Sequence, residues 1–175
     1  MLISALIFMM ALFPPSPADS DTLIVLSDSM YVAGGSIVNL GVTSSWRFSP
    51  GDDIRWAEPR FDHSDWVKQR PSGITEPLPS PLWDEGYGWF RTYFMADSSI
   101  YNNPWYFYFY TWGAAEVYID GELVQSYGQF STNPKDEVRY NPRNELYPAF
   151  SLAPKDTHLI AVRLSYHPAQ RYQNL

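Results

Sequence analysis

The sequence predicts an all-β fold, a two-sheet antiparallel β-sandwich, and three observations support this prediction. Apolar and polar residues alternate with a period of two in many short segments between about residues 23 and 166, and Gly, Pro, Asn and Asp bound these segments. Helical periodicity is scarce, and no helix of crossover length is predicted between the strands, which disfavours a parallel α/β sheet. The 175 residues suffice for one well-filled domain and are too few for two ordinary ones.

The first predicted strands are short, and one stronger strand follows them. The weak candidates are Leu23–Leu26, Ile37–Leu40 and Ser45–Phe48, and the stronger one is Trp89–Phe94. Between them, the segment from Arg70 to Tyr87 carries four prolines and reads as one long loop. Loops of this length in compact domains are usually functional or act as lids, so this loop is a candidate ligand site.

An aromatic strand is predicted at Trp105–Tyr110. Its alternation places Trp105, Phe107 and Phe109 on one face and three tyrosines on the other. We expect the first face to pack in the core. The tyrosine face can be half-exposed, because each phenol hydroxyl needs a partner or water.

The clearest local prediction is a β-hairpin in Ala115–Val124. Two alternating runs are joined by Asp120 and Gly121, and Asp-Gly tolerates the positive φ of a type I′ turn. A weak strand is predicted at Glu137–Tyr140. The closing strand, Leu159–Tyr166, should present one apolar face. That face consists of Ile160, Val162, Leu164 and Tyr166.

Residues 1–18 are expected to be a signal peptide, followed by a single domain over residues 19–175. Leu2–Phe13 is apolar except for Ser4, is too short to span a bilayer, and precedes the small residues Ser16 and Ala18 of a plausible cleavage site. No Lys or Arg precedes it. We therefore expect an exported protein, in the periplasm or on the extracellular face of the membrane.

The composition argues against several classes of function. The chain has no cysteine, so disulfides and thiolate chemistry are excluded, and the formal net charge of −7 without a basic run argues against nucleic acid as a partner. The three histidines have no metal-ligand spacing, and no catalytic motif is found, so we expect no catalytic residue, cofactor or metal ligand. The neighbouring carboxylates Asp52–Asp53 and Asp84–Glu85 are expected to be solvated in loops.

Several motifs together carry a resemblance to a known family over about residues 40–168. They are Trp46–Asp53, Trp56–Ala57, Phe61–Trp66, Gly88–Arg91 and Ala114–Val124, the last with Asp120 where Asn is usual. In this order they resemble the sugar-binding domain that opens many family 2 glycoside hydrolases. The fold implied by the resemblance is a jelly-roll sandwich of the galactose-binding-like type.

The chain resembles still more closely the extracellular amino-terminal domain of bacterial transmembrane sensors with cyclase, phosphatase or histidine kinase outputs. The residues that carry this closer resemblance are Gly128, Pro134–Arg139, Tyr140–Pro142 and His158–Ser165. The resemblance implies that the membrane and output domains of the same longer chain are partners. Related sandwiches often hold a structural calcium ion, but no oxygen-rich loop of the EF-hand kind is present.

Two polar features are interpreted as structural. Phe61–Trp66 should form a turn in which Asp62 and Ser64 bond backbone N–H groups, while Phe61 and Trp66 anchor the turn in the core. Arg91 lies in an apolar strand and should be a paired arginine, with Glu116 or Asp120 as its partner.

These observations favour a non-catalytic, extracytoplasmic sensory or ligand-binding domain, with a saccharide or another small molecule as ligand. The candidate ligand-binding residues are Trp83, Tyr87, Tyr127 and Arg139. We expect the site at the loop edge of the sandwich rather than on a sheet face, because alternating faces are committed to packing or solvent. Two alternatives stay open: a carbohydrate-binding accessory domain of a secreted family 2-like glycosidase, and a structural or homodimerising spacer without ligand.

Overall fold

The structure of the chain is a computed structural model. The residues that the structure describes are 6–8, 23–27, 40, 46–71, 85–101, 103–109, 111, 113–141 and 148–167.

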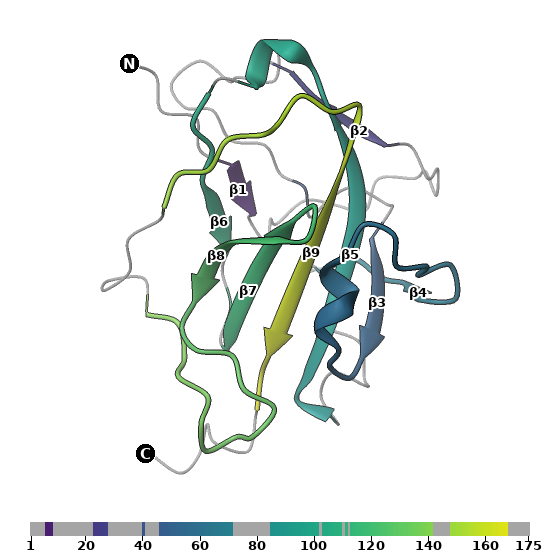
Figure 1. The fold of residues 1–175 in the computed structure, drawn as a ribbon. Coiled ribbons are helices and arrows are strands. Elements are labelled where there is room, and N and C mark those ends of the chain that lie inside the picture. Colours follow the sequence, from purple (N-terminus) through teal and green to yellow (C-terminus); the bar gives the residue numbers. More distant parts are fainter. Residues whose placement is uncertain are drawn as a thin grey trace, which may run out of the picture.

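Nine strands and two short 3₁₀ helices make up the regular structure of this part (Figure 1). The strands are β1 (Leu6–Phe8), β2 (Ile24–Leu26), β3 (Arg47–Pro50), β4 (Val67–Lys68), β5 (Tyr87–Ala96), β6 (Phe107–Phe109), β7 (Ala114–Ile119), β8 (Glu122–Tyr127) and β9 (Thr157–Ser165). The 3₁₀ helices are η3 (Ile54–Ala57) and η4 (Ser98–Ile100). The predicted all-β sandwich is confirmed.

One seven-stranded sheet dominates the fold, in the order β4-β3-β5-β9-β7-β8. The long strands β5 and β9 lie side by side at its centre, and β2 adds to the edge of β5 beyond the end of β3 (Figure 1). All pairs in this sheet are antiparallel except β2 with β5. A second, small sheet pairs β1 with β6, also in parallel. The prediction of purely antiparallel sheets is therefore wrong for the pairs β1–β6 and β2–β5.

The β7–β8 hairpin forms as predicted. Asp120 and Gly121 occupy its two-residue turn with φ of 52° and 94°, and Val117 pairs with Gln125 of β8. Both central residues of a type I′ turn need positive φ, which Asp tolerates and Gly adopts freely. The dipeptide therefore fixes the pairs Ile119–Glu122 and Tyr118–Leu123 next to the turn, and a β-bulge shifts the register between Tyr118 and Val117.

The inner face of the large sheet is apolar and builds the main core. It is formed by Phe48, Phe90, Phe94, Val117, Ile160, Val162 and Leu164. Across from it pack Trp105, Phe107, Tyr140 and Leu152, and the ring of Phe107 stacks on Phe150 at 4.9 Å between centroids. The predicted core positions of Trp105 and Phe107 are thus confirmed.

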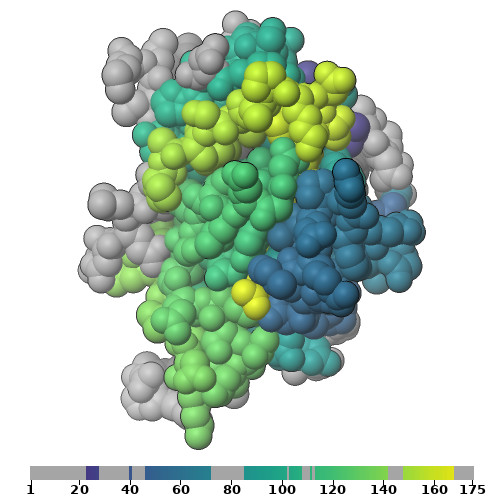
Figure 2. Space-filling model, in the orientation of Figure 1, coloured from purple at the N-terminus to yellow at the C-terminus, as the bar shows by residue number. Residues whose placement is uncertain are grey.

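The outer face of the same sheet is covered by the segment that runs from Gly51 to Trp66. Figure 1 shows η3 in front of the central strands, and in Figure 2 this segment (blue) packs beside residues 113–141 (green), with only a small patch of β9 (yellow) between them. Its apolar residues form a second cluster with the sheet. This cluster holds Trp56, Ala57, Phe61, Trp66, Trp89, Tyr93, Tyr118, Leu159 and Ala161.

Other strand predictions had mixed outcomes. Leu23–Leu26, Trp89–Phe94 and Leu159–Tyr166 correspond to β2, β5 and β9, whereas Ser45–Phe48 overlaps β3 only at Arg47 and Phe48. Glu137–Tyr140 is wrong as a strand, because only Val138 forms an isolated bridge, to Gln129. Of Ile37–Leu40, only Leu40 lies within the described residues. Helices long and apolar enough to cross a membrane are absent from the described ranges.

Candidate binding pocket on the outer face

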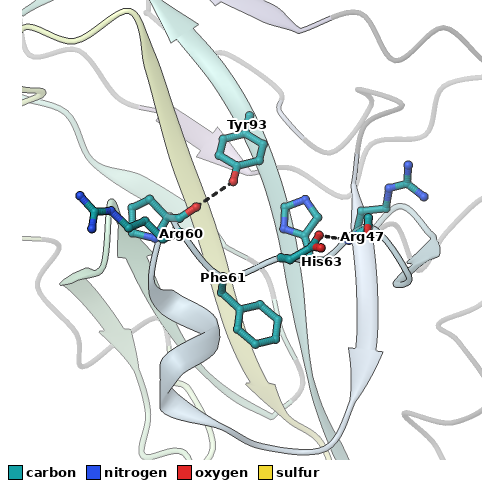
Figure 3. Close-up of a pocket in the computed structure, with 8 residues that line it drawn as sticks. Arg47, Arg60, Phe61, His63 and Tyr93 are labelled. Atoms are coloured by element: carbon teal, nitrogen blue, oxygen red, sulfur yellow. Dashed lines mark hydrogen bonds between the residues drawn. The ribbon is translucent and has the colours of Figure 1, made fainter.

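A surface pocket of about 350 Å³ opens on the outer face, where the turn after η3 meets β3 and β5 (Figure 3). It is lined by Arg47, Pro59, Arg60, Phe61, Asp62, His63, Ser64 and Tyr93. Six of these eight residues belong to one continuous turn, 59–64, while Arg47 comes from β3 and Tyr93 from β5. The pocket therefore depends on how that turn is fixed to the sheet.

Local hydrogen bonds shape the turn. The Ser64 amide donates to Oδ1 of Asp62 at 2.9 Å, and the Trp66 amide donates to the carbonyl of His63 at 3.0 Å. Trp66 is buried, and its ring lies 6.1 Å from that of Phe61. The interpretation of Phe61–Trp66 as an anchored turn is confirmed.

Side chains of β5 hold the turn against the sheet. The Tyr93 hydroxyl donates to the carbonyl of Pro59 at 3.0 Å. Fully buried Arg91 donates from its two Nη atoms to the carbonyls of Glu58 and Phe61, at 2.9 and 3.1 Å. Since buried carbonyls need donors, these contacts fix the backbone beneath the pocket.

The predicted partner of Arg91 is wrong. Neither Glu116 nor Asp120 contacts it; its guanidinium lies over the rings of Phe61 and Trp66, 5.4 and 5.7 Å from their centroids. Carbonyl oxygens and aromatic faces take the place of a carboxylate, an arrangement open to a planar guanidinium. Burial lowers the pKa of Arg91.

His63 lies in the wall of the pocket, between Tyr93 and Arg47 (Figure 3). Its ring centroid is 5.4 Å from that of Tyr93 and 6.0 Å from that of Trp66. Burial, followed by the charges of Arg91 and Arg47, lowers the pKa of His63 to about 4, although Asp62 and Asp65 act in the opposite direction. The imidazole is therefore neutral at pH 7.

The pocket combines half-buried rings with polar groups on its rim. The rings of Phe61, His63 and Tyr93 are partly exposed, and the guanidinium groups of Arg47 and Arg60 lie on opposite sides of the site (Figure 3). Nη1 of Arg47 donates to the carbonyl of Trp66 at 3.3 Å. Such a surface can stack a flat apolar face of a ligand and donate hydrogen bonds around it.

The residues predicted to bind ligand are not brought together with this pocket. Trp83 lies outside the described residues. Tyr87 is half-buried at the start of β5, with its ring 6.3 Å from that of His167, and Arg139 is exposed. Tyr127 is fully buried, and its hydroxyl donates to the carbonyl of Phe107 at 2.6 Å, which makes it a core residue rather than part of a loop edge.

A second polar cluster joins the covering segment to the sheet. Arg163 donates from Nε to Oδ1 of Asp52 at 2.7 Å and from Nη1 to Oε2 of Glu116 at 3.0 Å. Trp89 Nε1 donates to the same Asp52 oxygen at 3.0 Å. The expectation that Asp52 is merely solvated is wrong, because the side chain is only 17% exposed and bonds three donor atoms.

A third cluster ties the hairpin turn to the start of β9. Oδ1 of Asp120 accepts from Nζ of Lys155 at 2.8 Å and from the Leu159 amide at 3.0 Å, and Oδ2 lies 2.6 Å from Nδ1 of His158. The carboxylate thus serves three donors. Within the described ranges, no group of three or more His, Asp or Glu side chains could hold a metal ion.

One signal for the pocket was present in the sequence. Odd-numbered residues of β5 read Trp89, Arg91 and Tyr93, a face that is aromatic and cationic rather than merely solvated. Read with the Phe61–Trp66 turn, this face could have indicated a site on the sheet. The prediction of a loop-edge site rests instead on the premise that alternation commits both faces of a sheet to packing or solvent.

Comparisons with known proteins give low structural similarity only. No family model and no curated protein matches the chain. A Bacteroides uniformis β-glucuronidase structure has a TM-score of 0.44 at 17% identity, covering 71% of this chain and 14% of that one. A glycosyl hydrolase family 2 member from Bacteroides cellulosilyticus has a TM-score of 0.40 at 18% identity, covering 70% of this chain and 17% of that one. A Bifidobacterium dentium β-glucuronidase has a TM-score of 0.42 at 13% identity, covering 69% of this chain and 19% of that one. The chain spans less than a fifth of the length of these proteins.

Proposed function

We propose that this chain is a non-catalytic, saccharide-binding accessory domain whose ligand site is the outer-face pocket. The observation that carries the proposal is a pocket that combines the half-buried rings of Phe61, His63 and Tyr93 with hydrogen-bonding groups. Sugars present apolar C–H faces that stack on aromatic rings and hydroxyls that need donors and acceptors. The sequence resemblance to the sugar-binding domain of family 2 glycoside hydrolases points to the same class of ligand.

The size and rigidity of the pocket support this proposal. Its volume of about 350 Å³ lies at the lower end of the range of about 300–1,000 Å³ that small-molecule sites occupy. Arg91 and Tyr93 bond three carbonyls of the segment 58–61, so the turn is held before a ligand arrives. A preformed site loses little conformational entropy on binding.

The absence of catalysis is also proposed. The carboxylates Asp52 and Glu116 come together on the outer face, but Arg163 bonds both and the Tyr118 hydroxyl donates to Glu116 at 2.6 Å. Carboxylates neutralised in this way are poor candidates for an acid and base pair. Any catalysis would then belong to another domain of the same protein.

The sensory function is the second interpretation and rests on the sequence resemblance to bacterial sensors. It shares with the first an exported location and a non-catalytic ligand-binding domain. The two differ in the rest of the protein, since a sensor needs a membrane segment and an output domain. Both are compatible with a ligand in the outer-face pocket.

The test is calorimetric titration against a panel of mono- and disaccharides, comparing Tyr93→Ala with Tyr87→Ala. Both tyrosines are half-buried on the same face of β5, but only Tyr93 lines the pocket. Loss of one stacking ring removes about 1–2 kcal/mol, so Tyr93→Ala should weaken binding about 5- to 30-fold while Tyr87→Ala leaves it unchanged. Tyr93→Phe, which keeps the ring, should restore most of the affinity.

Two results would contradict the proposal. If no saccharide of the panel binds at millimolar concentration, the chain is not a saccharide-binding domain. If Tyr87→Ala or Trp83→Ala weakens binding and Tyr93→Ala does not, the ligand sits at the loop edge and the pocket is the wrong site.

A further inference from the structure

We propose that the outer-face pocket selects anionic saccharides, those that carry a carboxylate or sulfate group, over neutral ones. This inference rests on the proposed function of the same pocket and adds the class of ligand. The observation that carries it is a row of cations across the sheet beside the pocket.

The strand register places three basic residues directly opposite one another. Arg47 of β3 pairs with Lys68 of β4 on one side and with Arg91 of β5 on the other. Directly paired residues of antiparallel strands point to the same face, with Cβ atoms about 4.5–5.5 Å apart, and like charges in such positions are destabilising. Arg47 and Arg91 therefore place two positive charges side by side on the outer face.

The next row of the same sheet is built differently. There Ser49, Trp89, Arg163 and Glu116 stand opposite one another in that order. Arg163 forms ion pairs with Glu116 and Asp52, and Arg55 forms one with Asp53. Two arginines of this region thus carry their own carboxylates.

The arginines at the pocket have no such partner. In the part of the chain that the structure describes, Arg47, Arg60 and Arg91 form no ion pair, and Arg47 and Arg91 bond only carbonyl oxygens. The nearby carboxylate of Asp62 accepts from the Ser64 amide. The lining of the pocket holds two arginines and one aspartate, whereas the whole chain carries a net charge of −7.

The protonation of His63 agrees with a positive local field. Burial is the largest cause of its lowered pKa, and Arg91 and Arg47 each contribute more than either Asp62 or Asp65. An anion placed beside His63 and Arg47 would relieve this field. The neutral imidazole of His63 can donate a hydrogen bond to this anion and carries no negative charge that would repel it.

Guanidinium geometry fits the proposed group. A guanidinium forms two parallel hydrogen bonds with a carboxylate or a sulfate, and such charge-assisted pairs are about twice as strong as neutral ones. One Nη of Arg47 is held by the Trp66 carbonyl, which orients the group. The rings of His63 and Tyr93 remain for the sugar itself.

The experiment titrates the full chain with D-galactose, D-galacturonate and D-galactose 6-sulfate, which share a ring and differ in charge at one carbon. We expect at least one of the two anions to bind about 10-fold more tightly than galactose, with an affinity that falls as NaCl is raised from 20 to 300 mM. Arg47→Gln should remove this advantage, so that the variant binds the anions no more tightly than it binds galactose. Arg139→Gln, at an exposed arginine outside the pocket, is the matched control.

The outcomes separate the two proposals. If all three sugars bind equally and Tyr93→Ala weakens each, saccharide binding stands and the preference for anions is wrong. If the preference exists but Arg139→Gln abolishes it as well as Arg47→Gln does, the pocket does not cause it and the inference fails. If none of the three binds, both proposals fail.

Discussion

The two faces of the central sheet carry different kinds of side chain on the same strands. In β5, Phe90 and Phe94 point inward to an apolar core, whereas Trp89, Arg91 and Tyr93 point outward to aromatic rings, carbonyls and charges. The inner face has the alternation that any sandwich needs. The outer face shows that a covered sheet surface can also carry a pocket, between the sheet and its covering segment.

The largest effect is expected on the inner face, for Phe90→Ala. Phe90 is fully buried and its ring lies 4.8 Å from that of Phe48, so truncation leaves a cavity at the centre of the sheet. The free energy of unfolding should fall by about 3–5 kcal/mol. Urea denaturation measures this, with Phe90→Leu as the milder control, and a loss below about 1 kcal/mol would mean that the inner face is not the main core.

On the outer face, Arg91→Met should lower the free energy of unfolding less than Phe90→Ala does, but should disturb the pocket more. The variant keeps an unbranched buried side chain but leaves the carbonyls of Glu58 and Phe61 without their donors, which costs about 1–3 kcal/mol. Arg139→Met, at an exposed position, should stay within about 0.5 kcal/mol. An Arg91→Met protein as stable as the wild type would show that the turn is held by its rings alone.

The hydrogen bonds of the Asp120 carboxylate to Lys155, His158 and the Leu159 amide should contribute about 1 kcal/mol to the free energy of unfolding. Asp120→Asn tests this contribution. Asn also tolerates the positive φ of this turn, so the change removes the charge and keeps the backbone. Burial acts to raise the pKa of Asp120, but hydrogen bonds from Lys155, the Leu159 amide and His158 outweigh it and hold that pKa below its usual value.

This shift determines the sign of the pH dependence. A carboxyl whose pKa is lower in the folded than in the unfolded chain, where it is about 3.9, stabilises the fold above that pH. Its contribution is lost as pH falls through the folded-state pKa. The difference in stability between wild type and Asp120→Asn should therefore shrink as pH falls below about 4 in thermal unfolding. A difference that grows on acidification would contradict the stabilising role of the Asp120 carboxylate.

The smallest effect is expected at Leu123, an apolar residue that belongs to neither face cluster. Its side chain is 52% exposed on the edge strand β8. Leu123→Thr should change the free energy of unfolding by no more than about 0.5 kcal/mol. A loss above 1.5 kcal/mol in thermal or urea unfolding would indicate a packing contact on this edge.

The sequence predicted the fold well where local chemistry decides it. The Asp120-Gly121 turn, the apolar face of Ile160, Val162 and Leu164, and the Asp62–Ser64 turn depend on residues close along the chain, and the structure has them. The parallel pairing of β2 was missed because it depends on which strand edge is free, which no local pattern encodes.

The candidate site was harder to predict because it is assembled from distant segments. Arg47, His63 and Tyr93 come from β3, a turn and β5, and only the strand register brings them together. The partners of Arg91 are backbone carbonyls, which every residue carries, so no side-chain pattern reveals them. The burial of Tyr127 likewise depends on distant residues, Tyr140 and Phe107, rather than on the pattern of its own strand.

The most direct test of the outer-face pocket is a map of backbone amide chemical shifts in a ¹⁵N-labelled chain titrated with D-galacturonate. We predict that the largest perturbations fall on residues 60–64, Arg47 and Tyr93, whereas the amides of Trp105, Phe107 and Leu152, which lie across the core from the sheet, stay unchanged. Saturating shifts confined to residues 71–87 would instead place the ligand at the loop edge. That result would contradict the assignment of the binding site to the outer face of the sheet.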